Sequence, residues 1–238
     1  MSDLSLAAAI SFPPAQGAPR QLFILLHGVG GSPQDMVPLA ATLQRAFAEA
    51  AVFIPPGFAG FDGGRPGRQW FSVTAVSDEN RPGRVAQAMP ALLALVRGAQ
   101  EHFGVLPPDT ALVGFSQGGI MALEACAAAD GLAGRVIAFS ARYATLPSRP
   151  PLLTTIHLLH GAADTVVPAE HSRVAMARLS ELAGDATLDI ASTVGHALHP
   201  SLVGRAIVRL QTCIPLRTWK RALGTVPAME PEGRRQPH

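Results

Sequence analysis

Residues 110–125 read TALVGFSQGGIMALEA, and the run GFSQG at residues 114–118 decides the fold. The apolar residues before it are typical of a strand, and those after it are typical of a helix. A serine flanked by glycines in a turn from strand to helix is the pattern of a nucleophile elbow. The bare pattern also occurs by chance, so Ser116 is either a nucleophile or an ordinary strand-end serine. The rest of the chain has to decide between them.

Two further side chains follow in chain order, each just after a predicted strand. Residues 155–159 form a short apolar strand, and Asp164 lies in the loop beyond it. Residues 186–191 alternate as a half-exposed strand does, and His196 follows them. The order Ser116, Asp164, His196 is the α/β-hydrolase order. A serine hydroxyl is a weak nucleophile, so an imidazole must take its proton and a carboxylate must hold that imidazole in the right tautomer.

Each of these partners has a competitor. Asp164 could simply cap the helix that follows it, as aspartate often does. The other acids, Asp185 and Asp189, lie before or inside a strand and so cannot follow its C-terminal end. His199 precedes a proline at a helix start, whereas His196 follows a glycine directly after a strand. The sequence therefore favours Asp164 and His196 over their neighbours.

A glycine-rich turn is the fourth element of the expected site. The buried strand LFILL at residues 22–26 runs into HGVGGS at residues 27–32. Such a turn can aim a backbone N–H at an acyl oxygen, and the residue after the nucleophile supplies a second donor. We expect these donors to be the main-chain N–H groups of Val29 and Gln117.

The remaining histidines do not indicate a metal site. His27 and His160 each precede a glycine at a strand end, and we interpret both as buried, hydrogen-bonded structural groups. His196 and His199 are three residues apart, but the chain has no His-Glu-x-x-His run and no closely spaced cysteine pair. We therefore expect no metal.

Several motifs together resemble those of the phospholipase/carboxylesterase family, the acyl-protein-thioesterase-like branch of α/β hydrolases. They are residues 27–30, 114–119, 161–168 and 195–196. Residues 68–73, with 139–143, look most like the bacterial YpfH-type esterases in that family. The resemblance covers about residues 20–215. It implies a small serine esterase, without metal or cofactor, that acts on carboxylic esters or thioesters.

Composition agrees with one enzyme domain. The chain has 238 residues, of which 48% are apolar and 15% charged, and its net charge of +2 is too small to indicate a nucleic-acid partner. No apolar run reaches the length of about 20 residues that spans a membrane, so we expect no stable membrane insertion. The N-terminus lacks the features of a signal peptide, which makes the cytoplasm the expected compartment. Nothing in the sequence predicts an oligomeric state.

Predicted strands and helices alternate, which indicates a mostly parallel sheet with helices on both faces. Strands are expected near 6–12, 21–27, 51–54, 110–115, 135–140, 155–160 and 186–191. Helices are expected at 34–48, 85–103, 117–129, 168–183 and 198–212, with Pro90 kinking the second or confining its regular part. Residues 1–215 are expected to form a single domain. Residues 216–238 are basic and proline-rich, and we expect a flexible tail there.

Residues 55–83 form a long connection rich in glycine and proline, and no insertion is long enough for a lid domain. We expect Trp70 and Phe71 in this connection, together with Met36 and Tyr143, to form an apolar wall around the acyl group of a small ester or thioester substrate. In the alternative interpretation, Trp70 only anchors its loop to the body.

Two classes of function fit this fold. One is a hydrolase that forms an acyl-enzyme, with an amide or lactone hydrolase as its nearest variant. The other is a binding protein that keeps the pocket without the reaction, because a fold does not imply a function. All the expected catalytic groups are present, and this favours the enzyme.

Overall fold

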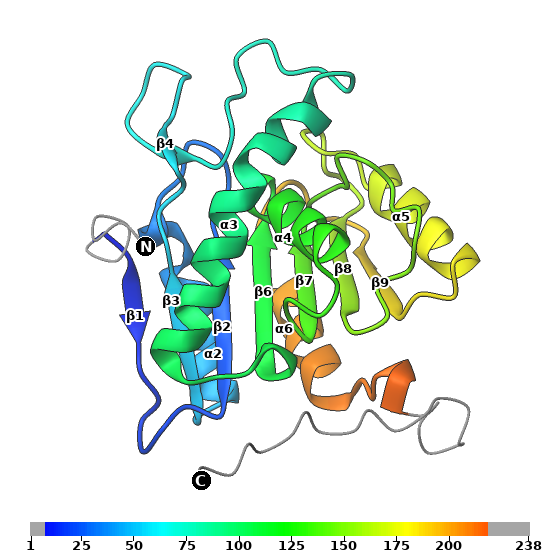
Figure 1. Cartoon of the computed structure of the whole chain (residues 1–238). Coiled ribbons are helices and arrows are strands. Elements are labelled where there is room, and N and C mark those ends of the chain that lie inside the picture. Colours follow the sequence, from blue (N-terminus) through cyan, green and yellow to red (C-terminus); the bar gives the residue numbers. More distant parts are fainter. Residues whose placement is uncertain (1–7, 219–238) are drawn as a thin grey trace, which may run out of the picture.

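The computed structural model describes residues 8–218, and their centre is a seven-stranded sheet in the order β1-β3-β2-β6-β7-β8-β9 (Figure 1). Its strands are β1 (Ile10–Phe12), β2 (Gln21–Leu26), β3 (Ala50–Ile54), β6 (Thr110–Phe115), β7 (Arg135–Phe139), β8 (Thr155–Gly161) and β9 (Ala186–Ala191). All neighbours are parallel except β1, which pairs antiparallel with β3. The predicted strands are confirmed, and the one expected near residues 6–12 is a three-residue edge strand.

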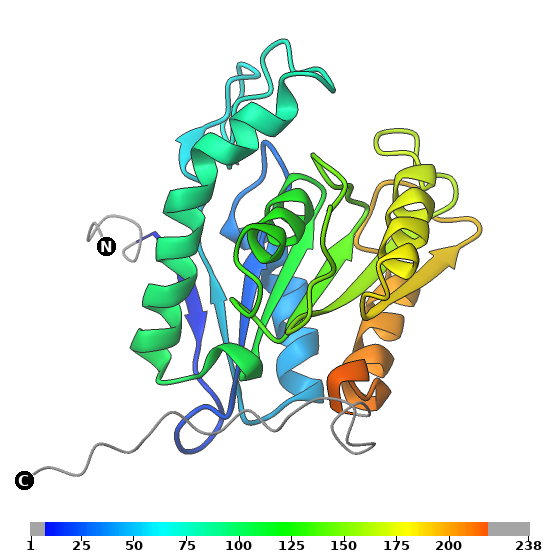
Figure 2. The same cartoon turned by 45° about the vertical axis from the view of Figure 1, so that its right-hand side comes forward.

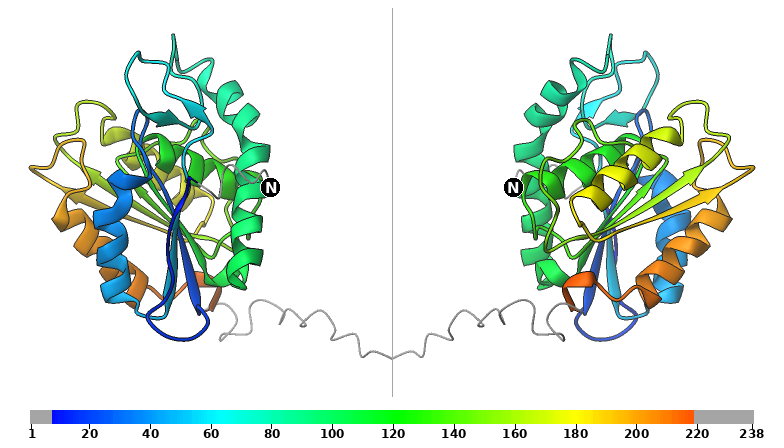
Figure 3. Two further views of the ribbon diagram at one scale, coloured as in Figure 1. Left: turned by 90° about the vertical axis from the view of Figure 1, so that its left-hand side faces the viewer. Right: turned by 90° about the vertical axis from the view of Figure 1, so that its right-hand side faces the viewer.

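Helices cover both faces of the sheet, as its edge-on view shows (Figure 3). One face carries α2 (Val37–Ala46), which follows the 3-10 turn η1 (Pro33–Met36), and α6 (Pro200–Thr212). The other face carries α3 (Arg81–Phe103), α4 (Gln117–Ala128) and α5 (Glu170–Glu181). The predicted α/β architecture is therefore confirmed.

Strand β2 shows why the central strands read as unbroken apolar runs. Leu22, Ile24 and Leu26 pack on the α3 side, whereas Phe23 and Leu25 pack on the α2 side. All five side chains are buried. A strand covered on both faces has no exposed side to keep polar, so the alternation expected of a half-exposed strand is lost.

Helix α3 runs as one 23-residue element through Pro90, so the expectation that Pro90 would confine the regular part is wrong. Proline removes one helical hydrogen bond, but the buried side chains of Val85, Met89 and Leu92 hold the helix against the core on both sides of it. The helix ends at Gly104, whose φ of 65° is left-handed and whose N–H bonds back to the last turn.

The long connection between β3 and α3 projects beyond the C-terminal edge of the sheet (Figure 2). It contains two short paired strands, β4 (Ala59–Gly60) and β5 (Arg68–Gln69). Trp70 directly follows β5 and is only 2% exposed. This indole anchors the connection to the body of the protein, because a large aromatic side chain buries much apolar area.

The C-terminal region stays in contact with the sheet beyond residue 215. The Leu216 N–H donates to Asp185 Oδ2 over 2.9 Å, and Arg217 donates to Thr155 Oγ1 over 3.1 Å. The first two residues of the expected tail are thus hydrogen-bonded to the body, and residues 219–238 lie outside the described residues. Among residues 8–218, no helix is both long and apolar enough to cross a membrane.

His157 on β8 is a buried titratable group that is not among the predicted site residues. It is fully buried, and its Nδ1 lies 2.8 Å from Thr187 Oγ1, while Nε2 has no partner among residues 8–218. Burial, assisted by the positive charge of Arg135, lowers the pKa of His157 to about 4. The native state therefore keeps this imidazole neutral in mildly acidic solution.

We expect His157 to make folding sensitive to acid. The native pKa of His157 is about 4 and its unfolded pKa is 6.5. Between these pH values the imidazole is protonated in the unfolded state but neutral in the native state, so a fall in pH favours unfolding. The free energy of unfolding should fall by about 3 kcal/mol over this range through His157 alone. Denaturant titrations across it should give a shallower pH dependence for His157→Asn than for the wild-type protein. Equal slopes would contradict this assignment.

Candidate active site

The turn at Ser116 joins β6 to α4 and has a strained backbone. Ser116 has φ 53° and ψ −117°, a region that residues other than glycine seldom enter. The flanking glycines allow neighbouring chain segments to approach very closely. A Cβ on Gly114 would lie 2.3 Å from the Gly118 oxygen, and a Cβ on Gly118 would lie 2.1 Å from the Leu26 oxygen. The turn therefore requires glycine at positions 114 and 118.

The structure brings together the three side chains that the sequence selects. His196 Nε2 lies 3.0 Å from Ser116 Oγ, and His196 Nδ1 lies 2.7 Å from Asp164 Oδ2. A carboxylate only accepts hydrogen bonds, so Nδ1–H donates to Asp164 and Nε2 is left to accept from the serine hydroxyl. The His196 ring also packs against Phe115, with ring centroids 4.9 Å apart.

Asp164 uses its two oxygens for different purposes. Oδ1 accepts the N–H groups of Val166 and Val167 over 2.9 and 2.8 Å, and Oδ2 faces His196. Burial alone would raise the pKa of Asp164, but the hydrogen bonds from His196, Val167 and Val166 outweigh it and lower the pKa. Asp164 does not cap α5, whose N-cap is Ala169; its Oδ1 holds the loop before that helix, and its Oδ2 contacts His196.

The competing residues have other partners. Asp185 accepts from Thr155 Oγ1 over 2.6 Å, and Asp189 forms an ion pair with Arg209 over 2.8 Å. His199 is the N-cap of α6, where its Nδ1 accepts the Ser201 N–H over 3.2 Å. None of the three is bonded to Ser116 or His196 among the described residues.

His27 and His160 are buried and hydrogen-bonded on both ring nitrogens. His27 Nδ1 lies 2.7 Å from the Gly28 oxygen, and its Nε2 accepts the Gly57 N–H over 2.9 Å. His160 donates through Nε2 to the Val167 oxygen over 2.7 Å, and the same nitrogen lies 3.3 Å from Asp164 Oδ2. Burial lowers the pKa of both histidines. The contact between His160 and Asp164 was not predicted, although their i, i+4 spacing at a strand end was a usable signal.

The glycine-rich turn lies beside Ser116, because a Cβ on Gly28 would lie 3.5 Å from the Ser116 Cβ. Within residues 8–218 the Val29 N–H has no acceptor, and the Gln117 N–H belongs to the first turn of α4, where helical N–H groups are unpaired. The glycine-rich turn and the first turn of α4 therefore both lie next to Ser116, and each has a backbone N–H without an acceptor in this part of the chain.

The four residues expected to form an acyl wall do not form one surface. Met36, Trp70, Phe71 and Tyr143 are all at most 7% exposed. Met36 packs in the cluster under α2 and α6, whereas the other three belong to the cluster under α3 and α4. Trp70 and Phe71 also line a hollow of 400 Å³ beside α3.

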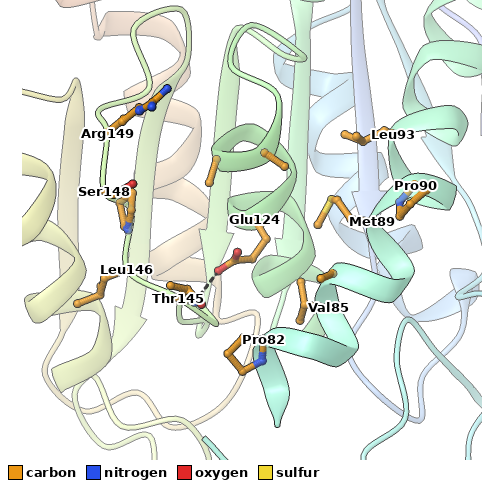
Figure 4. A pocket seen from close by; sticks show the side chains of 14 residues that line it. Pro82, Val85, Met89, Pro90, Leu93, Glu124, Thr145, Leu146, Ser148 and Arg149 are labelled. Atoms are coloured by element: carbon orange, nitrogen blue, oxygen red, sulfur yellow. Dashed lines mark hydrogen bonds between the residues drawn. The ribbon is translucent and has the colours of Figure 1, made fainter. Parts of the chain in front are cut away.

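A separate apolar groove of 740 Å³ lies between α3, α4 and the loop at residues 145–149 (Figure 4). Val85, Met89 and Leu146 supply much of its apolar lining. Glu124 faces the groove and accepts the N–H groups of Ala144 and Thr145, and its burial raises the pKa of its carboxyl. None of the four expected wall residues lines this groove.

No group of three or more His, Cys, Asp or Glu side chains within residues 8–218 could hold a metal ion. The class of the fold is α/β hydrolase. It is defined by the parallel sheet, the strained serine turn and the contacts between Asp164, His196 and Ser116.

Comparison with known proteins gives the family. Residues 10–214 match the Phospholipase/Carboxylesterase family, and the chain belongs to it. Esterase YpfH of Escherichia coli (strain K12) is 42% identical over 210 residues, which are 88% of each chain. The protein is therefore a hydrolase of the serine-esterase type.

Solved structures agree with this fold. The crystal structure of esterase PE8 has a TM-score of 0.79 at 28% identity and covers 87% of this chain and 99% of its own. Acyl-protein thioesterase 2 of Zea mays has a TM-score of 0.68 at 19% identity, covering 85% of this chain and 97% of its own. At that identity the second likeness shows the fold alone.

The close approach at the serine turn can be tested by adding one methyl group. Gly118→Ala would press a Cβ against the Leu26 carbonyl, which cannot move without shifting β2, and should lower the free energy of unfolding by about 3 kcal/mol or more. Gly204→Ala in α6 is the matched control, because its Cβ would meet no atom within 4 Å, and it should raise stability by about 0.5–1 kcal/mol. Denaturant unfolding measures both. A Gly118→Ala protein as stable as wild type would refute this packing.

Proposed function

We propose that the protein cleaves carboxylic ester or thioester bonds through a covalent acyl-enzyme. In this proposal Ser116 is the nucleophile, His196 is the general base and acid, and Asp164 orients His196 and stabilises its protonated form. The observation that carries the proposal is the unbroken chain of hydrogen bonds from Asp164 through His196 to the hydroxyl of a strained serine turn.

The first half of the reaction forms the acyl-enzyme. Ser116 Oγ attacks the carbonyl carbon of the substrate while its proton passes to His196 Nε2. Negative charge collects on the carbonyl oxygen, and the N–H groups of Val29 and Gln117 stabilise it. When the tetrahedral intermediate collapses, His196 returns the proton to the departing alkoxide or thiolate. An alcohol or thiol leaves, and the acyl group remains on Ser116.

The second half regenerates the enzyme. His196 takes a proton from water, whose oxygen attacks the acyl carbon, and the same two N–H groups stabilise the second intermediate. His196 then protonates Ser116 Oγ as the carboxylic acid leaves. Each step uses groups of this chain alone, so the proposed reaction needs no metal or cofactor, and its substrate is a small-molecule ester or thioester.

The same geometry gives less support to the alternative that the protein only binds a ligand without catalysing a reaction. A protein that only binds its ligand has no use for a serine held in a strained conformation, with a cost of about 1–3 kcal/mol. It also has no use for an imidazole aimed at that serine over 3.0 Å. Strain of this kind persists where the surrounding structure maintains it, and it clusters at reactive sites.

Removal of the hydroxyl tests the nucleophile. Ser116→Ala should lose essentially all hydrolysis of p-nitrophenyl esters, and its melting temperature should stay close to that of wild type, because the hydroxyl is a small part of the turn. Ser180→Ala on the exposed side of α5 serves as the control and should keep full activity. Initial rates over a series of acyl lengths measure both. Wild-type rates in Ser116→Ala would sink the proposal.

The acid can be tested without removing volume. Asp164→Asn keeps the shape but offers His196 an amide in place of a carboxylate, and kcat should fall by about 10⁴-fold, the effect known for a serine-protease triad. The control is Asp189→Asn, a variant of the acid that pairs with Arg209 instead, and it should retain kcat within about 3-fold. If both variants lose the same small factor, another group orients His196.

A further inference from the structure

The side chain of Gln117 makes a pair of hydrogen bonds that the proposed reaction does not itself require. Its Oε1 accepts the Trp70 N–H over 2.8 Å, and its Nε2 donates to the Phe71 oxygen over 2.8 Å. The residue is 3% exposed. The oxygen and the nitrogen of this buried amide are thus both bonded to the main chain of the long connection, in the way that a main-chain peptide group of a neighbouring β-strand would be.

The same stretch of the connection, residues 68–71, also holds the glycine-rich turn. Arg68 exchanges main-chain hydrogen bonds with it, because Gly30 N–H donates to the Arg68 oxygen over 2.8 Å and Arg68 N–H donates to the Gly31 oxygen over 2.7 Å. The Trp70 indole N–H donates to the His27 oxygen over 2.8 Å, and the two rings pack 5.3 Å apart. Residues 68–71, which we name the brace, are therefore tied to both sides of the site.

We infer that the brace sets the distance between the two proposed oxyanion donors, the N–H groups of Val29 and Gln117, and that the side chain of Gln117 is the tie that connects them. Gln117 is then a positioning residue through its side chain, in addition to being a donor through its main chain. The inference rests on the proposed function, because it gives the brace a purpose only if those N–H groups stabilise negative charge.

The physical reason lies in where the two donors come from. Gln117 begins α4 directly after β6, and β6 pairs with β2 up to Leu26, but Val29 lies three residues beyond the end of β2, in the glycine-rich turn. Both must lie about 2.7–3.1 Å from the same oxygen. A displacement of about 1 Å in such a site can cost about 10²-fold in rate. A glycine-rich turn cannot by itself keep its N–H within that distance of the oxygen, because glycine populates many backbone conformations.

A matched pair of variants separates positioning from simple stabilisation. Gln117→Met keeps the volume and the main-chain N–H but removes both side-chain hydrogen bonds. The control is Gln100→Met in α3, since Gln100 is also buried and makes two hydrogen bonds, to Thr110 and to the Leu132 oxygen. Both variants lose a buried amide, but only the first loses a contact with the brace.

The readouts are kcat and KM for a p-nitrophenyl ester and the inhibition constant of an alkyl trifluoromethyl ketone. Ser116 adds to that ketone and His196 takes its proton, so the adduct carries an oxyanion. For Gln117→Met we expect kcat to fall by about 10–100-fold with KM within about 3-fold, and ketone binding to weaken by the same factor as kcat/KM. For Gln100→Met we expect a lower melting temperature and kcat within about 2-fold of wild type.

Trp70→Phe provides a second test if Gln117→Met does not fold. It keeps an aromatic ring in the core, removes the indole N–H that bonds to the His27 oxygen and loses the five-membered part of the indole, and we expect kcat to fall by about 3–10-fold. The inference is overturned if Gln117→Met and Trp70→Phe, where they fold, lose only stability and keep the kcat and ketone binding of wild type. That is the result expected of the control Gln100→Met. Loss of the proposed function itself would look different, because the wild-type protein would then hydrolyse no ester at all.

Discussion

The structure depends on one close contact, the approach of the Gly118 backbone to the Leu26 carbonyl at the edge of the sheet. A side chain there would stand 2.1 Å from that oxygen, so α4 can start where it does only because position 118 has none. The same turn gives Ser116 its φ of 53°. The Ser116 N–H is anchored to the Phe139 oxygen over 2.9 Å, which ties the turn to β7 as well.

The other site groups arrive at this turn because the strands are parallel. The loops after β2, β6, β8 and β9 all leave the sheet at the same edge, so Val29, Ser116, Asp164 and His196 meet there although they are far apart in the chain. The long connection then covers one side of this edge, held by Trp70, and connects the glycine-rich turn to α4.

The sequence predicted most of the fold and selected the three side chains that meet at Ser116, because both leave local signals. Unbroken apolar runs mark buried strands, and a glycine-flanked serine or histidine after such a strand marks its functional edge. Met36 packs in one core cluster and Trp70, Phe71 and Tyr143 in the other, a division that the sequence does not reveal because no local pattern says which face of the sheet a side chain will join. Pro90 did not interrupt α3, because burial on both sides of it outweighs one lost hydrogen bond. The bond between Gln117 and the Trp70 main chain spans 47 positions and leaves no local signal.

The central claim is that the strained turn presents one activated serine. Its most direct test is reaction of the wild-type protein with a fluorophosphonate probe, followed by intact-mass measurement and peptide mapping. The account predicts one adduct per chain, located on Ser116, and no adduct on protein unfolded before the probe is added. An adduct on any other residue would contradict it. So would ester hydrolysis that continues unchanged while Ser116 stays unmodified.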